Sequence, residues 1–241
     1  MSNGYLMDGY HGEAAAYAPT SERIAFIRRT YAHLAVAIFA FVGLEALLLQ
    51  AGYGKKFLTA LMTQQISWLL VLVLFIGGGI GARYMARSQA APATQYLGLA
   101  LYVLLEVIIF LPLLALADHQ FPKKDIALQA GVMTLIVFGG LTAVVFLSKK
   151  DFSFLGHGLT MLSFLALGLI VCAILFQFNL GTWFSIAIIA LACGFILYDT
   201  SNILYHHRTN EHVAAALELF ASVALLFWYI VRLVMETSSN D

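Results

Sequence analysis

The sequence predicts an all-α membrane protein with seven transmembrane helices, and two observations carry this prediction. Of the 241 residues, 61% are hydrophobic and 11% are charged, and the mean hydropathy is +0.87. Soluble domains are about half apolar and about one quarter charged. The apolar residues also gather in runs of about twenty, the length that crosses the hydrocarbon core of a bilayer. We therefore expect a polytopic helical protein whose main partner is the lipid bilayer.

Seven such runs follow one another along the chain. They are residues 31–51, 66–86, 96–117, 126–147, 154–177, 180–204 and 213–235. The connections between them are short, so no loop is long enough to hold a soluble domain. Residues 23–241 are therefore predicted to form a single seven-helix transmembrane domain.

The first 22 residues differ from the rest of the chain. Residues 1–22 are small and polar and show no apolar period, which predicts a flexible tail. Arg23, Arg28 and Arg29 separate this tail from the first apolar run. We interpret that run as a lasting anchor and not as a signal peptide, because its basic residues come only after the tail.

The distribution of lysine and arginine predicts the orientation. With seven spans, one side of the membrane holds eight of these residues and the other side holds five. The eight are Arg23, Arg28, Arg29, Arg83, Arg87, Lys149, Lys150 and Arg208, and the five are Lys55, Lys56, Lys123, Lys124 and Arg232. The positive-inside rule then predicts a cytoplasmic N-terminus, with the tail in the cytoplasm, and a C-terminus outside.

The sixth apolar run ends in polar residues. Asp199, Asn202 and His206 are spaced i, i+3 and i+7, so they share one face of a helix. An ionisable side chain inside a membrane helix is costly and is by default a candidate functional residue. The alternative is that Asp199 lies at the membrane surface or in a structural ion pair. His206 and His207 follow in a loop, where a solvated position is the commoner explanation.

A second polar stripe lies on the last apolar run. Glu211, Glu218, Ser222 and Tyr229 fall at offsets of 7, 11 and 18 residues, a nearly straight line along a helix. Such a stripe should face the bundle interior or water, where it either lines a cavity or makes interhelical hydrogen bonds. In the predicted topology, Glu218 shares the cytoplasmic leaflet with Asp199 and with Arg83.

Two further carboxylates lie inside apolar runs. Glu106 is in the middle of the third run, and Glu45 is near the end of the first. Each is either a paired structural carboxyl group or part of an ion path. Glu106 is the stronger candidate because of its position in the middle of the span.

Residue types exclude several other classes of protein. The net charge is zero, so no basic surface indicates nucleic acid, and Cys172 and Cys193 lie inside apolar runs without ligand spacing. The chain has no HExxH motif, no Gly-x-Ser-Gly motif, and no Gly-x-Gly-Asp partner for the Asp199 carboxylate. All six lysines lie in loops, which excludes a retinal protein. We therefore expect no enzyme and no cofactor.

Four segments resemble the Bax inhibitor-1 family. They are RRTY at 28–31, FGGLTAVVFLSKKDFSFL at 138–155, LYDTSNIL at 197–204 and ALELFASVALLFWYIVRLV at 216–234. The resemblance covers nearly the whole chain beyond the tail. It implies a seven-helix fold with the last helix at the centre of the bundle, and a pH-sensitive calcium leak in many members. For a bacterial subgroup it implies binding and modulation of an FtsH-type membrane protease, and hence a location in the inner (plasma) membrane.

The resemblance also implies a leak mechanism with two pore aspartates, on the sixth and seventh helices, and a nearby arginine as latch. Asp199 matches the first aspartate, but Ser222 stands where the second would be. Glu218, one turn earlier, is our candidate substitute, which makes Asp199 and Glu218 candidate calcium ligands. A serine at position 222 also resembles the protease-modulator branch. Arg83 has a suitable depth for the latch.

Two functions therefore remain open after the sequence analysis. The first is a passive cation pathway gated by carboxylate protonation. A lone buried carboxylate takes up a proton, whereas an adjacent guanidinium keeps it ionised. We therefore expect Asp199 to pair with Arg83 in a closed state, with Glu218 facing them. The predicted pathway comprises Asp199, Glu218, Arg83, Ser222, Asn202 and Glu106. The second function is that of a non-enzymatic protein that binds an FtsH-type protease through its tail and helices.

Overall fold

The computed structural model describes residues 14–62, 66–87 and 92–239. Within these residues, seven helices are long and apolar enough to cross a membrane, which confirms the predicted all-α polytopic class. They are α1 (Thr20–Gln50), α3 (Ile66–Ala86), α4 (Pro92–Gln120), α5 (Ile126–Ser148), α6 (Gly156–Phe176), α7 (Gly181–Tyr205) and α8 (His212–Ser238). Each corresponds to one of the seven apolar runs.

Two short elements fall in connections that were not expected to be helical. Helix α2 (Tyr53–Met62) lies between the first two spans, and a single 3₁₀ turn, η1 (Ser153–Leu155), precedes α6. In α2, Lys55 and Lys56 interrupt the apolar pattern, so the segment is too short and too charged to be recognised as a span. It packs against α4 and α1, with Leu61 buried.

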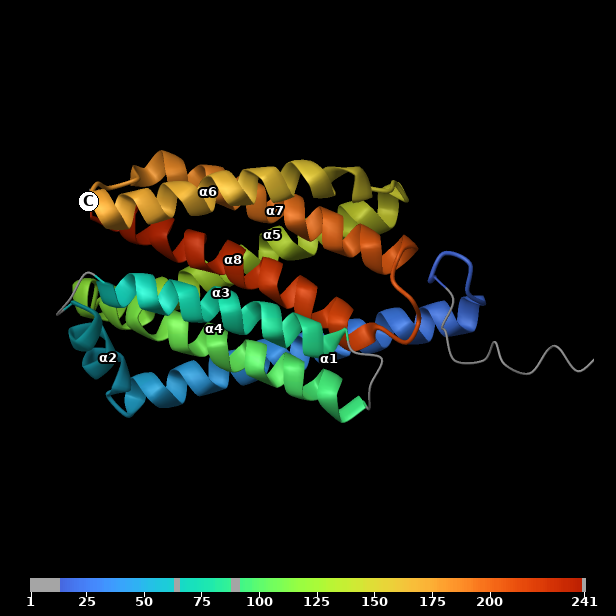
Figure 1. Cartoon of the computed structure of the whole chain (residues 1–241), viewed down its shortest axis with the longest axis horizontal. Coiled ribbons are helices and arrows are strands. Elements are labelled where there is room, and N and C mark those ends of the chain that lie inside the picture. Colours follow the sequence, from blue (N-terminus) through green and yellow to red (C-terminus); the bar gives the residue numbers. More distant parts are fainter. Residues whose placement is uncertain (1–13, 63–65, 88–91, 240–241) are drawn as a thin grey trace, which may run out of the picture.

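Helix α8 lies at the centre of the bundle, as the family resemblance implies. It packs against α1, α3, α4, α5 and α7, and in Figure 1 its red ribbon runs between the other helices. Ala214, Ala215 and Ala216 are all buried there. Small side chains let helices approach closely, which matters in a bilayer because lipid tails remove most of the hydrophobic drive for association.

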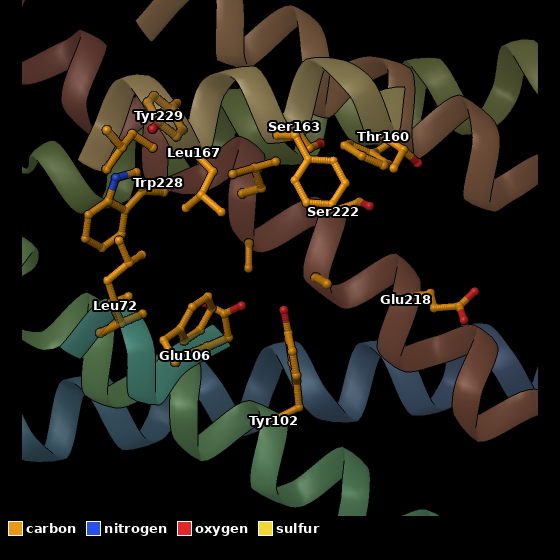
Figure 2. Close-up of a pocket in the computed structure, with 18 of the residues that line it drawn as sticks. Leu72, Tyr102, Glu106, Thr160, Ser163, Leu167, Glu218, Ser222, Trp228 and Tyr229 are labelled. Atoms are coloured by element: carbon orange, nitrogen blue, oxygen red, sulfur yellow. The ribbon is translucent and has the colours of Figure 1, made fainter. Parts of the chain in front are cut away.

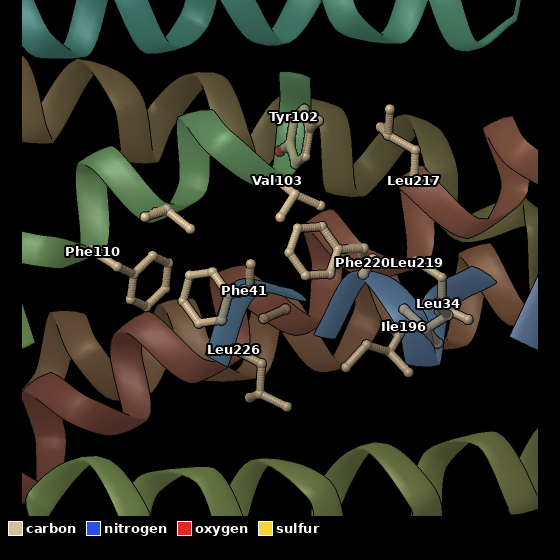
Figure 3. Close-up of a cluster of buried hydrophobic side chains, with 14 of the residues drawn as sticks. Leu34, Phe41, Tyr102, Val103, Phe110, Ile196, Leu217, Leu219, Phe220 and Leu226 are labelled. Atoms are coloured by element: carbon tan, nitrogen blue, oxygen red, sulfur yellow. The ribbon is translucent and has the colours of Figure 1, made fainter. Parts of the chain in front are cut away.

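An aromatic cluster forms the core around α8. The Phe41 ring of α1 contacts the Phe110 ring of α4 edge to face, with centroids 5.0 Å apart, and Phe110 stacks on Phe227 of α8 at 5.4 Å. Figure 3 shows Phe41, Phe110 and Phe220 together in this core. Such pairs contribute about 0.5–1.5 kcal/mol beyond their burial.

Helices α3 and α4 approach closely at Gly98. A Cβ atom at this position would lie 2.6 Å from the carbonyl oxygen of Ala82 and 2.7 Å from the amide nitrogen of Ala86. Only glycine fits there without a backbone shift. The approach brings the end of α3, which carries Arg83 and Arg87, beside the first half of α4.

The predicted tail needs a different boundary. Residues 1–13 lie outside the described residues, but α1 begins at Thr20, and the residues just before it are packed. The amide of Ala15 donates to the carbonyl oxygen of His207 at 2.8 Å, Ala15 is fully buried, and Ala14 forms a β-bridge with Arg208. The small alanine side chains let this segment pair with the α7–α8 connection, a contact that has no local pattern in sequence.

Candidate functional site

A cavity of about 1130 Å³ runs along α8, between this helix and α3, α4, α6 and the last part of α7 (Figure 2). It is bordered by Asn179 and Leu180, just before α7 begins, and by His206 and His207, just after α7 ends. The six residues of the predicted pathway all line it: Arg83, Glu106, Asp199, Asn202, Glu218 and Ser222. The structure thus brings these residues from four helices to one cavity.

Asp199 is held by the central helix. Its side chain is buried, and the Ser222 hydroxyl of α8 donates a hydrogen bond to Asp199 Oδ2 at 2.5 Å. A buried carboxylate needs hydrogen-bond donors to offset the loss of water. Ser222, which replaces the second aspartate that the resemblance implies, therefore supplies a donor where a second carboxylate would repel.

The predicted pair of Asp199 with Arg83 is absent from the described residues. Arg83 Nη2 instead donates to the Tyr102 hydroxyl at 3.4 Å, and the guanidinium carbon lies 5.4 Å from the centroid of the Tyr102 ring. The reason is the close approach of α3 and α4 at Gly98, which places an aromatic ring within reach of Arg83. An arginine gains from both a hydrogen bond and a ring face at such a position.

Among the carboxylates of the predicted pathway, Glu218 is the one that pairs with an arginine. Arg87 donates to Glu218 Oε1 from Nε at 2.9 Å and also from Nη2, while His207 Nε2 lies 3.1 Å from Glu218 Oε2. We expected Glu218 to face a pair formed by Asp199 and Arg83. In the structure Glu218 itself pairs with an arginine, Arg87. Arg87 was counted only as a loop charge, although it directly follows α3, four residues after Arg83.

His207 joins two carboxylates at this end of the cavity. Its Nδ1 lies 3.3 Å from Glu211 Oε2, and only 11% of the side chain is exposed. Burial alone would lower the pKa of His207, but the bonds to Glu211 and Glu218 outweigh it and raise the pKa to about 9. At neutral pH the imidazolium therefore donates from both ring nitrogens. We call Arg87, His207, Glu211 and Glu218 the mouth cluster.

A second polar network ties the α5–α6 connection to α7. Asp151 Oδ1 accepts from the Ser201 hydroxyl and the Ser153 amide, both at 2.9 Å, and Oδ2 lies 2.8 Å from His206 Nε2. Burial would raise the pKa of Asp151, but these bonds outweigh it and lower the pKa to about 2. This network links two of the segments that carry the family resemblance, KKDFS and YDTSN.

The remaining predicted polar residues have different surroundings. The main-chain carbonyl of Asn202 accepts from the amides of His206 and His207, both at 2.8 Å, and so closes the end of α7. Glu106 is buried on α4 and interacts with Tyr102; both side chains face the cavity in Figure 2. Glu45 is buried away from the cavity lining, and neither of its oxygens has a hydrogen-bond partner among the described residues.

In the part of the chain that the structure describes, no group of three or more His, Cys, Asp or Glu side chains is placed to hold a metal ion. Both oxygens of Glu218 are already bonded, to Arg87 and to His207. The assignment of Asp199 and Glu218 as calcium ligands stays a prediction.

The fold and the cavity define a polytopic α-helical membrane protein with buried carboxylates along an internal cavity. Residues 23–240 match the model of the family described as "Inhibitor of apoptosis-promoting Bax1". The chain therefore belongs to the Bax inhibitor-1 family, as the four segments indicated.

Curated relatives extend over nearly the whole chain. Protein lifeguard 4 of Mus musculus is 28% identical over 230 residues, which are 93% of this chain and 90% of the relative. Bax inhibitor 1 of Schizosaccharomyces pombe is 30% identical over 230 residues, 92% and 80% of the two chains. The Golgi anti-apoptotic protein of Vaccinia virus (strain Lister) is 28% identical over 240 residues, 97% and 94%. These names describe anti-apoptotic or membrane proteins and not enzymes. No solved structure matches the chain.

Proposed function

We propose that the protein is a pH-sensitive leak pathway for calcium or related cations, with Asp199 as the side chain that attracts the ion. One observation carries this proposal: a single cavity borders both ends of α7, and Asp199 lies on its wall with a serine, not a basic residue, as its hydrogen-bond partner. A carboxylate in a cavity of low dielectric attracts a cation far more strongly than one in water. Protonation removes that attraction.

In this proposal the mouth cluster closes one end of the cavity. It connects the end of α3 with α8 and with the α7–α8 connection, through Arg87, Glu218 and His207. Because the pKa of His207 is about 9, this residue stays charged between pH 5 and pH 8. In this proposal the pH sensitivity comes from protonation of Asp199, which removes the negative charge that attracts the cation.

We further propose that the protein lies in the inner (plasma) membrane with the mouth cluster toward the cytoplasm. The excess of basic residues on the side of the N-terminus supports this orientation. Reporter fusions at residue 1 and at residue 241 test it. A reporter that is active in the cytoplasm at both ends would contradict the proposed orientation.

The decisive experiment is calcium flux into proteoliposomes that contain only the purified protein, from pH 5 to pH 8. Asp199→Asn should lower the flux by about tenfold or more, a loss of about 1.4 kcal/mol or more of cation stabilisation. Asp118→Asn is the matched control, because Asp118 is exposed at the end of α4 and does not line the cavity. Equal flux and equal pH dependence in wild type and Asp199→Asn would overturn the leak proposal.

The second candidate function is the binding of an FtsH-type membrane protease. Two observations favour it: Ser222 stands in place of a second carboxylate, and Ala15 holds the start of the chain beside the cavity mouth. Under this proposal, deleting residues 2–12 abolishes co-purification with the protease and leaves calcium flux unchanged. Undiminished co-purification after the deletion would contradict it.

A further inference from the structure

The cavity is larger and more apolar than a path for hydrated cations requires. Its volume of about 1130 Å³ exceeds the roughly 300–1,000 Å³ of pockets that enclose an organic ligand of drug size. A water molecule takes about 30 Å³. Its middle part is lined by apolar side chains from α3, α6 and α8, among them Leu72, Leu167 and Trp228 (Figure 2).

One face of helix α6 lines the cavity, and its side chains change from polar to apolar along the helix. Thr160, Ser163, Phe164, Leu167, Ile170 and Ile174 line the cavity. Their spacing of three and four residues puts them on one face of the helix. This face is polar beside Asp199 and Ser222 and becomes apolar along the following three turns. Figure 2 shows the same change along the cavity, from Thr160 and Ser222 toward Leu167 and Trp228.

The arginines that line the cavity differ in their partners. Arg87 is paired with Glu218, and Arg232 lies 3.4 Å from Glu236. Arg83 has no carboxylate partner among the residues that the structure describes, and one hydrogen bond to Tyr102 leaves most of its five N–H donors available. Arg83 is therefore the residue of the cavity lining whose guanidinium group is available to bind an anion.

From these observations we propose that the cavity binds a long-chain fatty acid, with its carboxylate on Arg83 and its acyl chain along the apolar part between α3, α6 and α8. A planar guanidinium binds a carboxylate through two parallel hydrogen bonds. Asp199 would repel a head group placed toward α7, so the carboxylate lies on the side of Arg83. This proposal goes beyond ion conduction and does not depend on it.

Trp228 makes the proposal directly measurable, because it lines the apolar part of the cavity. In a Trp68→Phe, Trp183→Phe background it is the sole tryptophan of the chain. A fatty acid brominated in the middle of its chain quenches an indole that it touches. We expect saturable quenching in the detergent-purified full chain, reversed by the same fatty acid without bromine.

Substitutions of Arg83 and of Arg87, one turn apart, test whether the carboxylate head group binds Arg83. Arg83→Gln should weaken binding by about tenfold or more, the loss of a charge-assisted interaction, whereas Arg87→Gln should change it by less than about twofold. The brominated fatty alcohol of equal length should bind the wild type as weakly as the acid binds Arg83→Gln. Ala173→Phe, which narrows the cavity without touching the arginines, should weaken acid and alcohol equally.

Two results would overturn the proposal. The first is quenching that rises linearly and equally in all variants, which indicates partition into the micelle alone. The second is saturable binding of equal strength in wild type and Arg83→Gln, or in wild type and Ala173→Phe. The assay measures binding without an ion gradient. Its failure is therefore distinguishable from failure of the leak proposal, which rests on flux through Asp199.

Discussion

The two ends of the cavity both pair an arginine with a glutamate, but they do so in different ways. At the mouth cluster, Arg87 from the end of α3 meets Glu218 of α8, and His207 of the α7–α8 connection binds the same glutamate. At the opposite end, Arg232 and Glu236 are four residues apart on α8, and Ser185 of α7 adds one hydrogen bond at 3.3 Å. We call Arg232 and Glu236 the opposite-end pair.

The difference lies in what each pair connects. The opposite-end pair joins side chains that already belong to one helix, so it adds little to how the helices are arranged. The mouth cluster joins three separate segments, and its His207 is nearly enclosed. A change there must either separate the segments or leave a charge without its partner. If the cavity has a gate, the comparison locates it at the mouth cluster.

The largest expected effect comes from Glu218→Gln. This change leaves Arg87 and His207 without their shared carboxylate, and breaking a partly buried charged cluster costs about 2 kcal/mol. We expect a lower midpoint of thermal unfolding in detergent and a several-fold rise in calcium flux at pH 7. The exposed Glu22→Gln in α1 is the control and should match the wild type in both measurements. A stable variant with unchanged flux would show that the cluster is not a gate.

A pH titration separates the contribution of His207. Its pKa of about 9 lies above the ordinary value of about 6.5, so its stabilisation is complete below about pH 6.5 and is lost as the pH rises through about 9. The charged groups that face it are Glu211 and Glu218, with Arg87 beyond Glu218 and Asp199 deeper in the cavity.

We therefore expect the unfolding midpoint of the wild type to fall toward that of His207→Gln between pH 7 and pH 10. His119→Gln, an exposed histidine at the end of α4, should follow the wild type at every pH. Parallel curves for wild type and His207→Gln would mean that His207 is neutral in the folded protein at pH 7.

A smaller effect is expected inside the cavity, at the bond between Ser222 and Asp199. Ser222→Ala removes the hydroxyl donor and should lower the free energy of unfolding by about 1 kcal/mol. Ser222→Thr keeps a hydroxyl and should recover most of the loss. Thermal unfolding in detergent measures both variants. A threonine variant that is no more stable than the alanine variant would assign the effect to packing and not to the hydrogen bond.

The helices and the shared face of the polar residues could be predicted from the sequence because apolar runs and helical spacing are local. Run length identified the seven long helices, and the expectation that Asp199, Glu218 and Arg83 lie near one another agrees with the cavity that all three line. Helix α2 was missed because Lys55 and Lys56 interrupt its apolar pattern. These successes and this miss all depend on residues that are close together in the chain.

The pairing of charges could not be predicted because it depends on how one helix is shifted along another. Arg83 lies in the last turn of α3 and Arg87 directly follows α3, one turn later, so a shift of about 5–6 Å decides which of them meets a carboxylate of α8. That shift is set by the close approach at Gly98, which directs Arg83 to Tyr102 and leaves Arg87 for Glu218. No sequence motif in α3 or α8 indicates how far one helix is shifted along the other.

The smallest expected effect is at the opposite-end pair. Glu236→Gln should change the free energy of unfolding by less than about 0.5 kcal/mol, because Arg232 and Glu236 are neighbours four residues apart on one helix, and one oxygen of Glu236 has no hydrogen-bond partner among the described residues. Double-mutant cycles sharpen the comparison. The coupling energy between Arg87 and Glu218 should be about 1 kcal/mol, because the Arg87 side chain is 65% exposed and water screens the pair, and that between Arg232 and Glu236 about 0.5 kcal/mol or less. Equal coupling at both ends would mean that joining separate helices adds nothing to the mouth cluster, and the gate would then have to be sought at Asp199 itself.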